Sequence, residues 1–104
     1  MKVAVIVPTY NEAGAIGALC DEMADVFAAV PQHEWHTVIV DANSPDGTAD
    51  IVRAKAKQYP NIHLIVEAQK RGIAMAYITG MRYALDILQA DAFVEFDGDG
   101  QHDP

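Results

Sequence analysis

The chain has 104 residues, which is enough for one domain with a sizeable buried core but not for two. Apolar residues make up 51% and charged residues 21%, the balance of an ordinary folded domain rather than of a disordered segment. Fifteen acidic residues against seven basic ones give a net charge of -8, so we expect no nucleic-acid partner. A small anionic substrate would need a metal ion or helix N-termini to offset the carboxylates.

The single cysteine, Cys20, excludes an internal disulfide. It falls on the apolar stripe of a predicted helix, which favours a small core residue over the alternative of a nucleophile. No apolar run approaches the ~20 residues of a membrane span, and the short apolar stretch at the N-terminus gives way to Pro8, unlike a signal peptide. We therefore expect a cytoplasmic protein.

The first part of the chain predicts a strand, a helix and a second strand. Residues 3–7 form a short run rich in β-branched side chains, which favours a buried strand. Apolar residues then recur at helical spacing: Ile16, Leu19, Cys20, Met23 and Phe27. Thr9 and Glu12 match a capping box, with Thr9 as the N-cap of this helix. Residues 37–40 predict the second strand.

The remaining elements repeat this alternation. A helix is predicted from about Thr48 to Tyr59, where Pro60 ends it, followed by a strand at residues 62–66. A third helix carries its apolar residues on one side: Ile73, Ala76, Tyr77, Met81, Ala84, Leu85 and Leu88. Residues 92–96 predict the fourth strand. Because the four runs lack polar alternation, we expect cover on both faces of the sheet.

The order β-α-β-α-β-α-β predicts an α/β fold, a three-layer Rossmann-like and mostly parallel sheet joined by right-handed crossovers. In such sheets ligands bind beyond the carboxyl ends of the strands. Polar and acidic segments follow every predicted strand, at residues 8–12, 41–48, 70–72 and 97–104. Since neighbouring carboxylates repel one another, this clustering indicates a binding site.

Two of these segments offer candidate binding residues with alternatives that remain open. Asp41 either accepts hydrogen bonds from the N–H groups of a nucleobase or starts the turn that follows it. Lys70 and Arg71 either contact phosphate or form the solvated start of a helix.

The segment Asp97-Gly98-Asp99 is the candidate metal site. In extended geometry residues i and i+2 point to the same side, so two carboxylates would meet at one point, and Gln101 continues the alternation. Carboxylates together with substrate phosphates commonly hold Mg²⁺. The alternative is an acidic surface turn.

The histidines divide into two groups. His33, His36 and His63 fall away from the predicted ligand edge, so surface or packing roles are expected, whereas His102 adjoins the acidic cluster. The sequence contains no zinc-type spacing of His and Cys, no Gly-x-Gly-x-x-Gly and no Walker A motif. These absences argue against zinc, dinucleotide and P-loop chemistry.

Together, four segments resemble family 2 glycosyltransferases, and most closely the dolichol- or polyprenol-phosphate mannosyltransferase branch. They are IVPTYNE at 6–12, VDANSPDGT at 40–48, KRG at 70–72 with AYITGM at 76–81, and DGDGQHDP at 97–104. They occur in the family's order over nearly the whole chain. The resemblance implies a GT-A fold, of which residues 1–104 are the N-terminal, nucleotide-sugar-binding part, ending just after the Asp-x-Asp motif.

The resemblance also implies roles for particular residues. Those for nucleotide-sugar binding are Pro8, Tyr10, Glu12, Asp41, Lys70 and Asp97, with Asp41 recognising the base. Asp97, Asp99 and Gln101 would bind a divalent metal, Mg²⁺ or Mn²⁺, and Asp99 is the implied catalytic residue. The implied reaction is inverting, metal-dependent transfer of a hexose to an acceptor such as a polyprenyl phosphate. GDP-mannose is the favoured donor and a UDP-sugar the alternative.

Three positions depart from the family pattern. Ala42 replaces a second aspartate that often follows Asp41, Glu67 stands near the place of an arginine, and Ala74 replaces a common glycine. These changes bear on the diphosphate contacts and the choice of donor.

The length of the chain adds further expectations. Family members continue well past Asp-x-Asp with an acceptor site, and full-length relatives often lie at the cytoplasmic face of a membrane. We therefore expect the 104-residue chain to be inactive alone, to leave apolar surface near the fourth strand uncovered, and to self-associate there. The alternative function is a non-catalytic nucleotide-sugar-binding fragment. A receiver-type signalling domain is a third candidate, but it gives residues 8–12 and 101–104 no role.

Overall fold

The computed structural model describes residues 1–69 and 71–96, and these form alternating strands and helices. The order of elements confirms the predicted β-α-β-α-β-α-β pattern. The elements are β1 (Lys2–Thr9), α1 (Ile16–Ala29), β2 (Glu34–Asp41), α2 (Thr48–Gln58), β3 (Ile62–Val66), α3 (Ile73–Tyr83), the π-helical η1 (Ala84–Leu88) and β4 (Ala92–Glu95). None of the described helices is both long and apolar enough to cross a bilayer.

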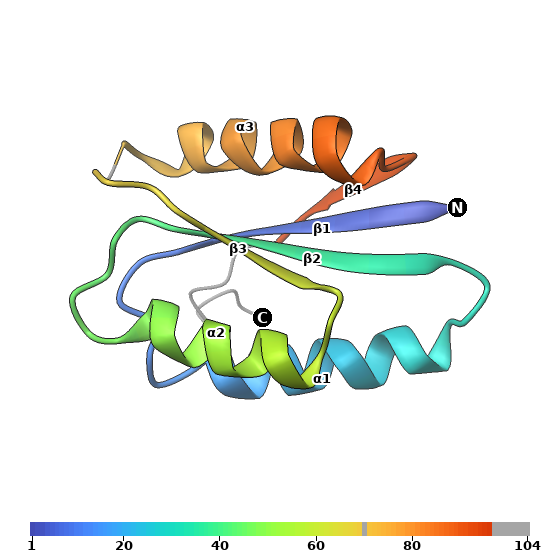
Figure 1. The fold of residues 1–104 in the computed structure, drawn as a ribbon, viewed down its shortest axis with the longest axis horizontal. Helices are drawn as coiled ribbons and strands as arrows, with labels where there is room; N and C mark the ends of the chain where they lie inside the picture. The colour runs from blue at the N-terminus through green and yellow to red at the C-terminus, as the bar shows by residue number, and fades with distance from the viewer. Residues whose placement is uncertain (70, 97–104) are drawn as a thin grey trace.

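The four strands form one parallel sheet in the order β3-β2-β1-β4. Helices α1 and α2 lie on one face and α3 lies on the other, which gives three layers (Figure 1). The chain moves outward from β1 to β3 and then returns past β1 to place β4 on its other side. Ligands bind at such a reversal of strand order, outside the carboxyl ends of the strands. The predicted fold class is confirmed.

Alternate residues of the two central strands fill two hydrophobic clusters, one on each face of the sheet. On the α3 face the buried residues are Ala4, Ile6, Val38, Val40, Ala76, Ala84 and Leu88. On the opposite face they are Val5, Val7, Ile16, Cys20, Ile39, Val52 and Ile62. Cys20 is thus a core residue, as predicted, and burial raises the pKa of its thiol to about 11.

The expectation of cover on both faces holds for β1 and β2 but is wrong for the edge strands. β3 is mostly half-buried, and Phe93 and Val94 of β4 remain 36% and 44% exposed. The helices pack over the centre of the sheet, so an edge strand receives less of their cover. Apolar surface is therefore exposed near the fourth strand, as expected, while self-association there stays a prediction.

In the third helix, the buried residues differ from the apolar stripe that the sequence predicts. Leu85 was expected on the buried side but is 54% exposed, whereas Ala76, Gly80, Ala84 and Leu88 are buried at steps of four residues. The helix changes from α to π hydrogen bonding at Ala84, which widens the turn and rotates the following residues relative to a regular helix.

The predicted capping box is wrong. Thr9 is the last residue of β1, and α1 begins only at Ile16 with no side-chain cap. Instead, the carbonyl oxygen of Glu12 accepts hydrogen bonds from the N–H groups of Ala15 and Ile16, at 2.9 and 2.8 Å. Thr9 lies too far from the start of α1 to cap it, and its hydroxyl instead donates to the carboxylate of Asp41 on β2.

Gly80 lets α3 approach the sheet closely. A Cβ atom at this position would overlap Cγ2 of Ile6 and lie 3.2 Å from Cγ2 of Val40. Both of those atoms belong to buried core side chains, which have little room to shift.

We expect Gly80→Ala to lower the free energy of unfolding by about 1–3 kcal/mol, because overpacking outweighs the better helix propensity of alanine. Gly17→Ala in α1 is the matched control, since its Cβ would lie 3.6 Å from its nearest neighbours, an ordinary contact. That control should be neutral or stabilising by up to ~1 kcal/mol. Denaturant unfolding measures both, and equal effects would contradict the proposed close approach.

Candidate functional site

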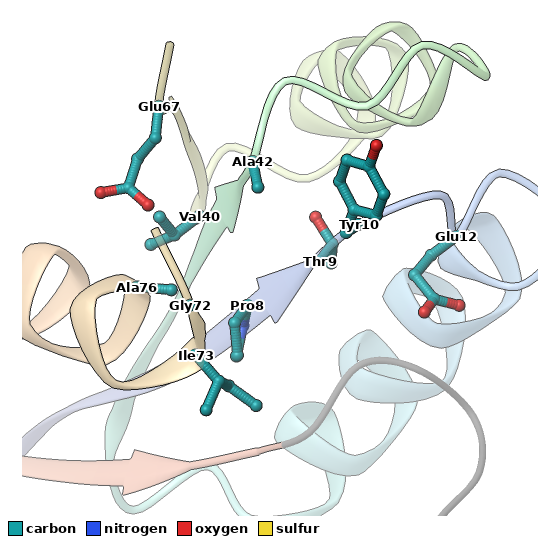
Figure 2. Close-up of a pocket in the computed structure, with 10 residues that line it drawn as sticks. All are labelled: Pro8, Thr9, Tyr10, Glu12, Val40, Ala42, Glu67, Gly72, Ile73 and Ala76. Atoms are coloured by element: carbon teal, nitrogen blue, oxygen red, sulfur yellow. The ribbon is translucent and has the colours of Figure 1, made fainter. Parts of the chain in front are cut away.

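A cavity of about 310 Å³ opens at the carboxyl ends of the central strands, beside the start of α3 (Figure 2). This is large enough for a small-molecule site, for which volumes of ~300–1,000 Å³ are typical. The residues that line it are Pro8, Thr9, Tyr10, Glu12, Val40, Ala42, Glu67, Gly72, Ile73 and Ala76. The cavity therefore lies where the sequence predicted a ligand.

The cavity brings together three of the predicted binding residues: Pro8, Tyr10 and Glu12. They come from the end of β1 and the loop that follows it. In Figure 2 the Tyr10 ring stands between Glu12 and the end of β2, and 38% of Tyr10 is exposed. An aromatic ring at the mouth of a cavity offers a stacking surface to a planar ligand.

The other predicted site residues are placed differently. Lys70, Asp97, Asp99, Gln101 and His102 lie outside the described residues. Within residues 1–69 and 71–96, no group of three or more His, Cys, Asp or Glu side chains is arranged to hold a metal. Asp41 is described, but it does not line the cavity.

Asp41 is completely buried behind the cavity wall, and both of its carboxylate oxygens accept hydrogen bonds from the protein. Oδ1 accepts from the hydroxyls of Thr9 at 2.8 Å and Ser44 at 2.6 Å. Oδ2 accepts from the backbone N–H of Ser44 at 2.8 Å. This carboxylate therefore fixes the end of β1 against the turn after β2.

The loop after β1 is also held through its backbone. The N–H of Asn11 donates to Ser44 Oγ at 2.8 Å, that of Glu12 to Thr48 Oγ1 at 3.0 Å, and that of Ala13 to Asp46 Oδ2 at 3.0 Å. The hydrogen bond from the Thr48 hydroxyl is the main cause that lowers the pKa of Asp46; desolvation opposes it, and the N–H of Ala13 adds a smaller lowering effect. The loop that carries Tyr10 and Glu12 is thus fixed before any ligand arrives.

Sequence reasoning did not place Glu67 among the binding residues. It follows β3 directly, is 8% exposed and lines the cavity. Its Oε2 accepts hydrogen bonds from Arg71 Nη2 at 2.7 Å and from the Thr79 hydroxyl at 2.8 Å. Two features of the sequence could have indicated Glu67 as a binding residue: it directly follows a predicted strand, and it stands near the place of an arginine in the family pattern.

The start of α3 completes the cavity wall. Gly72 precedes the helix with a φ of 93°, a conformation that favours glycine, and Gly72 and Ile73 both line the cavity. The first N–H groups of a helix have no partner within the helix and favour negative charge. The cavity therefore has one side suited to an anionic group.

None of the three histidines expected to lie away from the site lines the cavity. His36 and His63 share a hydrogen bond of 2.9 Å between Nδ1 and Nε2. His36 also contacts Glu34 at 2.6 Å, and the Tyr83 hydroxyl lies 3.2 Å from His63 Nδ1. These four side chains form a polar chain that links β2, β3 and α3.

The chain is similar to members of a known protein family. The family model described as glycosyl transferase family 2 matches residues 4–104. An undecaprenyl-phosphate mannosyltransferase of Micrococcus luteus is 38% identical over 104 residues, covering 100% of this chain and 40% of that protein.

Two solved structures show the same arrangement of elements. The mannosyltransferase PcManGT of Pyrobaculum calidifontis, in complex with GDP-Man and Mn²⁺, is 34% identical with a TM-score of 0.76, covering 93% of this chain and 27% of that one. Residues 1–349 of TarS from S. aureus, in complex with UDP, are 28% identical with a TM-score of 0.73, covering 95% and 28%. The chain thus spans less than half the length of these relatives.

We expect Thr9→Val to lower the free energy of unfolding by about 1–3 kcal/mol, because buried Asp41 loses a hydrogen-bond donor. Thr37→Val is the matched control: Thr37 is also buried, but within the described part of the chain its hydroxyl donates only to the Met23 sulfur, at 3.9 Å. Urea unfolding of both variants measures the difference. A control that loses as much stability as Thr9→Val would contradict the importance of the Asp41 contacts.

We expect stability to decrease as the pH falls below about 6.5. Burial, and to a lesser degree the neighbouring His36, lower the pKa of His63 from its ordinary value of 6.5. The unfolded chain then takes up a proton more readily than the folded one, so the contribution of His63 is complete above pH 6.5 and is lost as the pH falls through its folded pKa.

Denaturant unfolding between pH 8 and pH 5 measures this effect. The interval stays above the ordinary pKa of Glu34, 4.5, whose own pKa is lowered mainly by its hydrogen bond to His36. His63→Gln should flatten the decrease, whereas the control His33→Gln, outside the polar chain, should retain it. An unchanged slope in His63→Gln would show that another group is responsible.

Proposed function

The chain belongs to glycosyl transferase family 2, and from this premise we propose that its cavity binds the nucleoside diphosphate sugar donor of a GT-A domain. Residues 1–104 are then the N-terminal, donor-binding part of that domain. The observation that carries the proposal is the cavity itself, which combines the rigid loop of residues 8–12 with the first turn of α3 at the carboxyl ends of β1 and β2.

The cavity offers a suitable surface for each part of a nucleotide. Tyr10 and Pro8 provide flat apolar surface for a base, and Glu12 provides acceptors for ribose hydroxyl groups. The N-terminal turn of α3 is favourable for phosphate, and Lys70 next to it in the sequence adds positive charge. These surfaces support a phosphorylated nucleoside rather than a neutral apolar ligand.

The proposed metal ligands are Asp97, Asp99 and Gln101, whose oxygen atoms are of the kind that Mg²⁺ and Mn²⁺ accept. Support comes from β4, which runs parallel to β1 and ends beside it, with the N–H of Phe96 donating to the carbonyl of Ile6 at 2.9 Å. Glu95, the last residue of β4, pairs with Ile6, two residues before Pro8 on β1, and the motif follows Phe96 in the sequence. A bound metal would neutralise charge on the departing nucleoside diphosphate.

The proposed reaction is inverting transfer of a hexose, mannose from GDP-mannose, to a polyprenyl phosphate. The relatives that act as mannosyltransferases support this choice of sugar and acceptor. A phosphate acceptor is already an anionic nucleophile, so Asp99 is proposed to act on the donor side rather than as a strong general base. Because the chain spans 40% of the Micrococcus relative, the second candidate is donor binding without transfer.

Calorimetric titration with GDP-mannose, GDP, UDP-glucose and UDP, with and without Mn²⁺, tests donor binding. We expect binding that depends on Mn²⁺ and falls about tenfold or more in Asp97→Asn and Asp99→Asn, since each change removes a charged ligand of the metal. Asp50→Asn, an exposed carboxylate on α2 whose side chain is 84% exposed, is the control and should bind normally. A folded chain that binds no nucleotide would contradict the proposal.

A further inference from the structure

One wall of the cavity carries a carboxylate whose place is not explained by packing alone. Glu67 is 8% exposed and follows β3, at the point where the backbone N–H of Glu67 donates to the carbonyl of Asp41 at 2.8 Å. A carboxylate is costly to bury unless its oxygens are hydrogen-bonded. The partners of its two oxygens therefore indicate what this residue does.

The two oxygens of Glu67 have different surroundings. Oε2 accepts from Arg71 and Thr79, whereas Oε1 has no hydrogen-bond partner among residues 1–69 and 71–96. Glu67 lines the cavity and is 8% exposed, so Oε1 is the oxygen that this carboxylate can offer to a ligand there. Figure 2 shows the carboxylate directed toward the Val40 side of the cavity.

Several of the described residues that line the cavity with Glu67 have no polar side chain: Ala42 and Ala76 are small, and Val40 is apolar. Asp41, whose carbonyl accepts from the N–H of Glu67, is fully buried, and both of its carboxylate oxygens accept hydrogen bonds from Thr9 and Ser44. Glu12 also lines the cavity, but it lies on the far side of Tyr10 (Figure 2).

We infer that Glu67, rather than Asp41, is the carboxylate that recognises the base of the donor, and that it selects guanine over uracil. The inference rests on the proposed binding of a nucleoside diphosphate sugar. A carboxylate is acceptor-only and binds N–H groups. Guanine presents adjacent N1–H and N2–H donors on one edge, while the single N3–H of uracil lies between two carbonyl oxygens that a carboxylate repels.

Arg71 and Thr79 are positioning residues in this arrangement. Their hydrogen bonds of 2.7 and 2.8 Å occupy Oε2 and hold the carboxylate plane, so that Oε1 keeps one orientation toward the cavity. A site that offers a fixed charged acceptor discriminates strongly against a ligand without the matching donor, because the acceptor is then left unpaired.

Calorimetry with GDP, inosine diphosphate and UDP, each with Mn²⁺, tests the inference on wild type and on Glu67→Gln. Inosine diphosphate differs from GDP only in lacking the N2 amino group. We expect wild type to bind GDP about tenfold or more tightly than either inosine diphosphate or UDP, as for hydrogen bonds to charged groups. Both ratios should shrink toward one in Glu67→Gln, while the control Asp50→Asn retains them.

The possible outcomes separate this inference from the proposed function. Equal wild-type affinity for GDP and UDP, or a GDP preference over inosine diphosphate that survives in Glu67→Gln, overturns the role of Glu67 while donor binding stands. Failure to bind any of the three diphosphates overturns donor binding and the inference with it. The ligand comparison in wild type needs no variant, so it decides the base preference even if Glu67→Gln folds poorly.

Discussion

The buried carboxylate of Asp41 is the interaction on which the site depends. A fully buried carboxylate is tolerated only where donors surround it, and here the donors come from β1 and from the turn after β2. Satisfying Asp41 therefore forces the end of β1, the end of β2 and Ser44 into one arrangement. The hydroxyl oxygen of Ser44 also accepts a hydrogen bond from the N–H of Asn11, which extends the constraint to the loop after β1.

This constraint explains how a loop with almost no regular structure is held in place. In residues 10–13, three successive N–H groups donate to side chains of the turn after β2 and the start of α2. The cavity that Tyr10 and Glu12 line is consequently formed without a ligand. Preorganisation of this kind reduces the ordering cost that binding must overcome.

Polar side chains are used differently at the two ends of the sheet's strands. At the carboxyl ends, polar groups surround an open cavity, and one of them, Glu67, has a carboxylate oriented by Arg71 and Thr79. Farther from the cavity, the side chains of the polar chain Glu34–His36–His63–Tyr83 hydrogen-bond to one another and link β2, β3 and α3. The first arrangement suits binding, and the second stabilises the way the helix packs on the sheet.

The sequence by itself determined the order of elements, the buried central strands, the family and the edge of the sheet at which the cavity opens. These follow from local periodicity, from the topology of parallel sheets and from motifs such as residues 6–12, all of which are present along the chain. Pro8, Tyr10 and Glu12 follow the first strand, and the structure places all three in the lining of the cavity, while their binding roles stay predictions.

Only the tertiary structure decided how individual side chains are used. Thr9 and Glu12 have the spacing of a capping box, but the hydroxyl of Thr9 donates a hydrogen bond to Asp41, which is distant in the sequence. Leu85 fits a regular helical stripe, but a π turn rotates it outward. Asp41 ends β2 and Glu67 directly follows β3, yet hydrogen-bond donors enclose the first carboxylate while the second residue lines a cavity. Such differences depend on long-range partners, and spacing along the chain does not specify which partner a polar group will find.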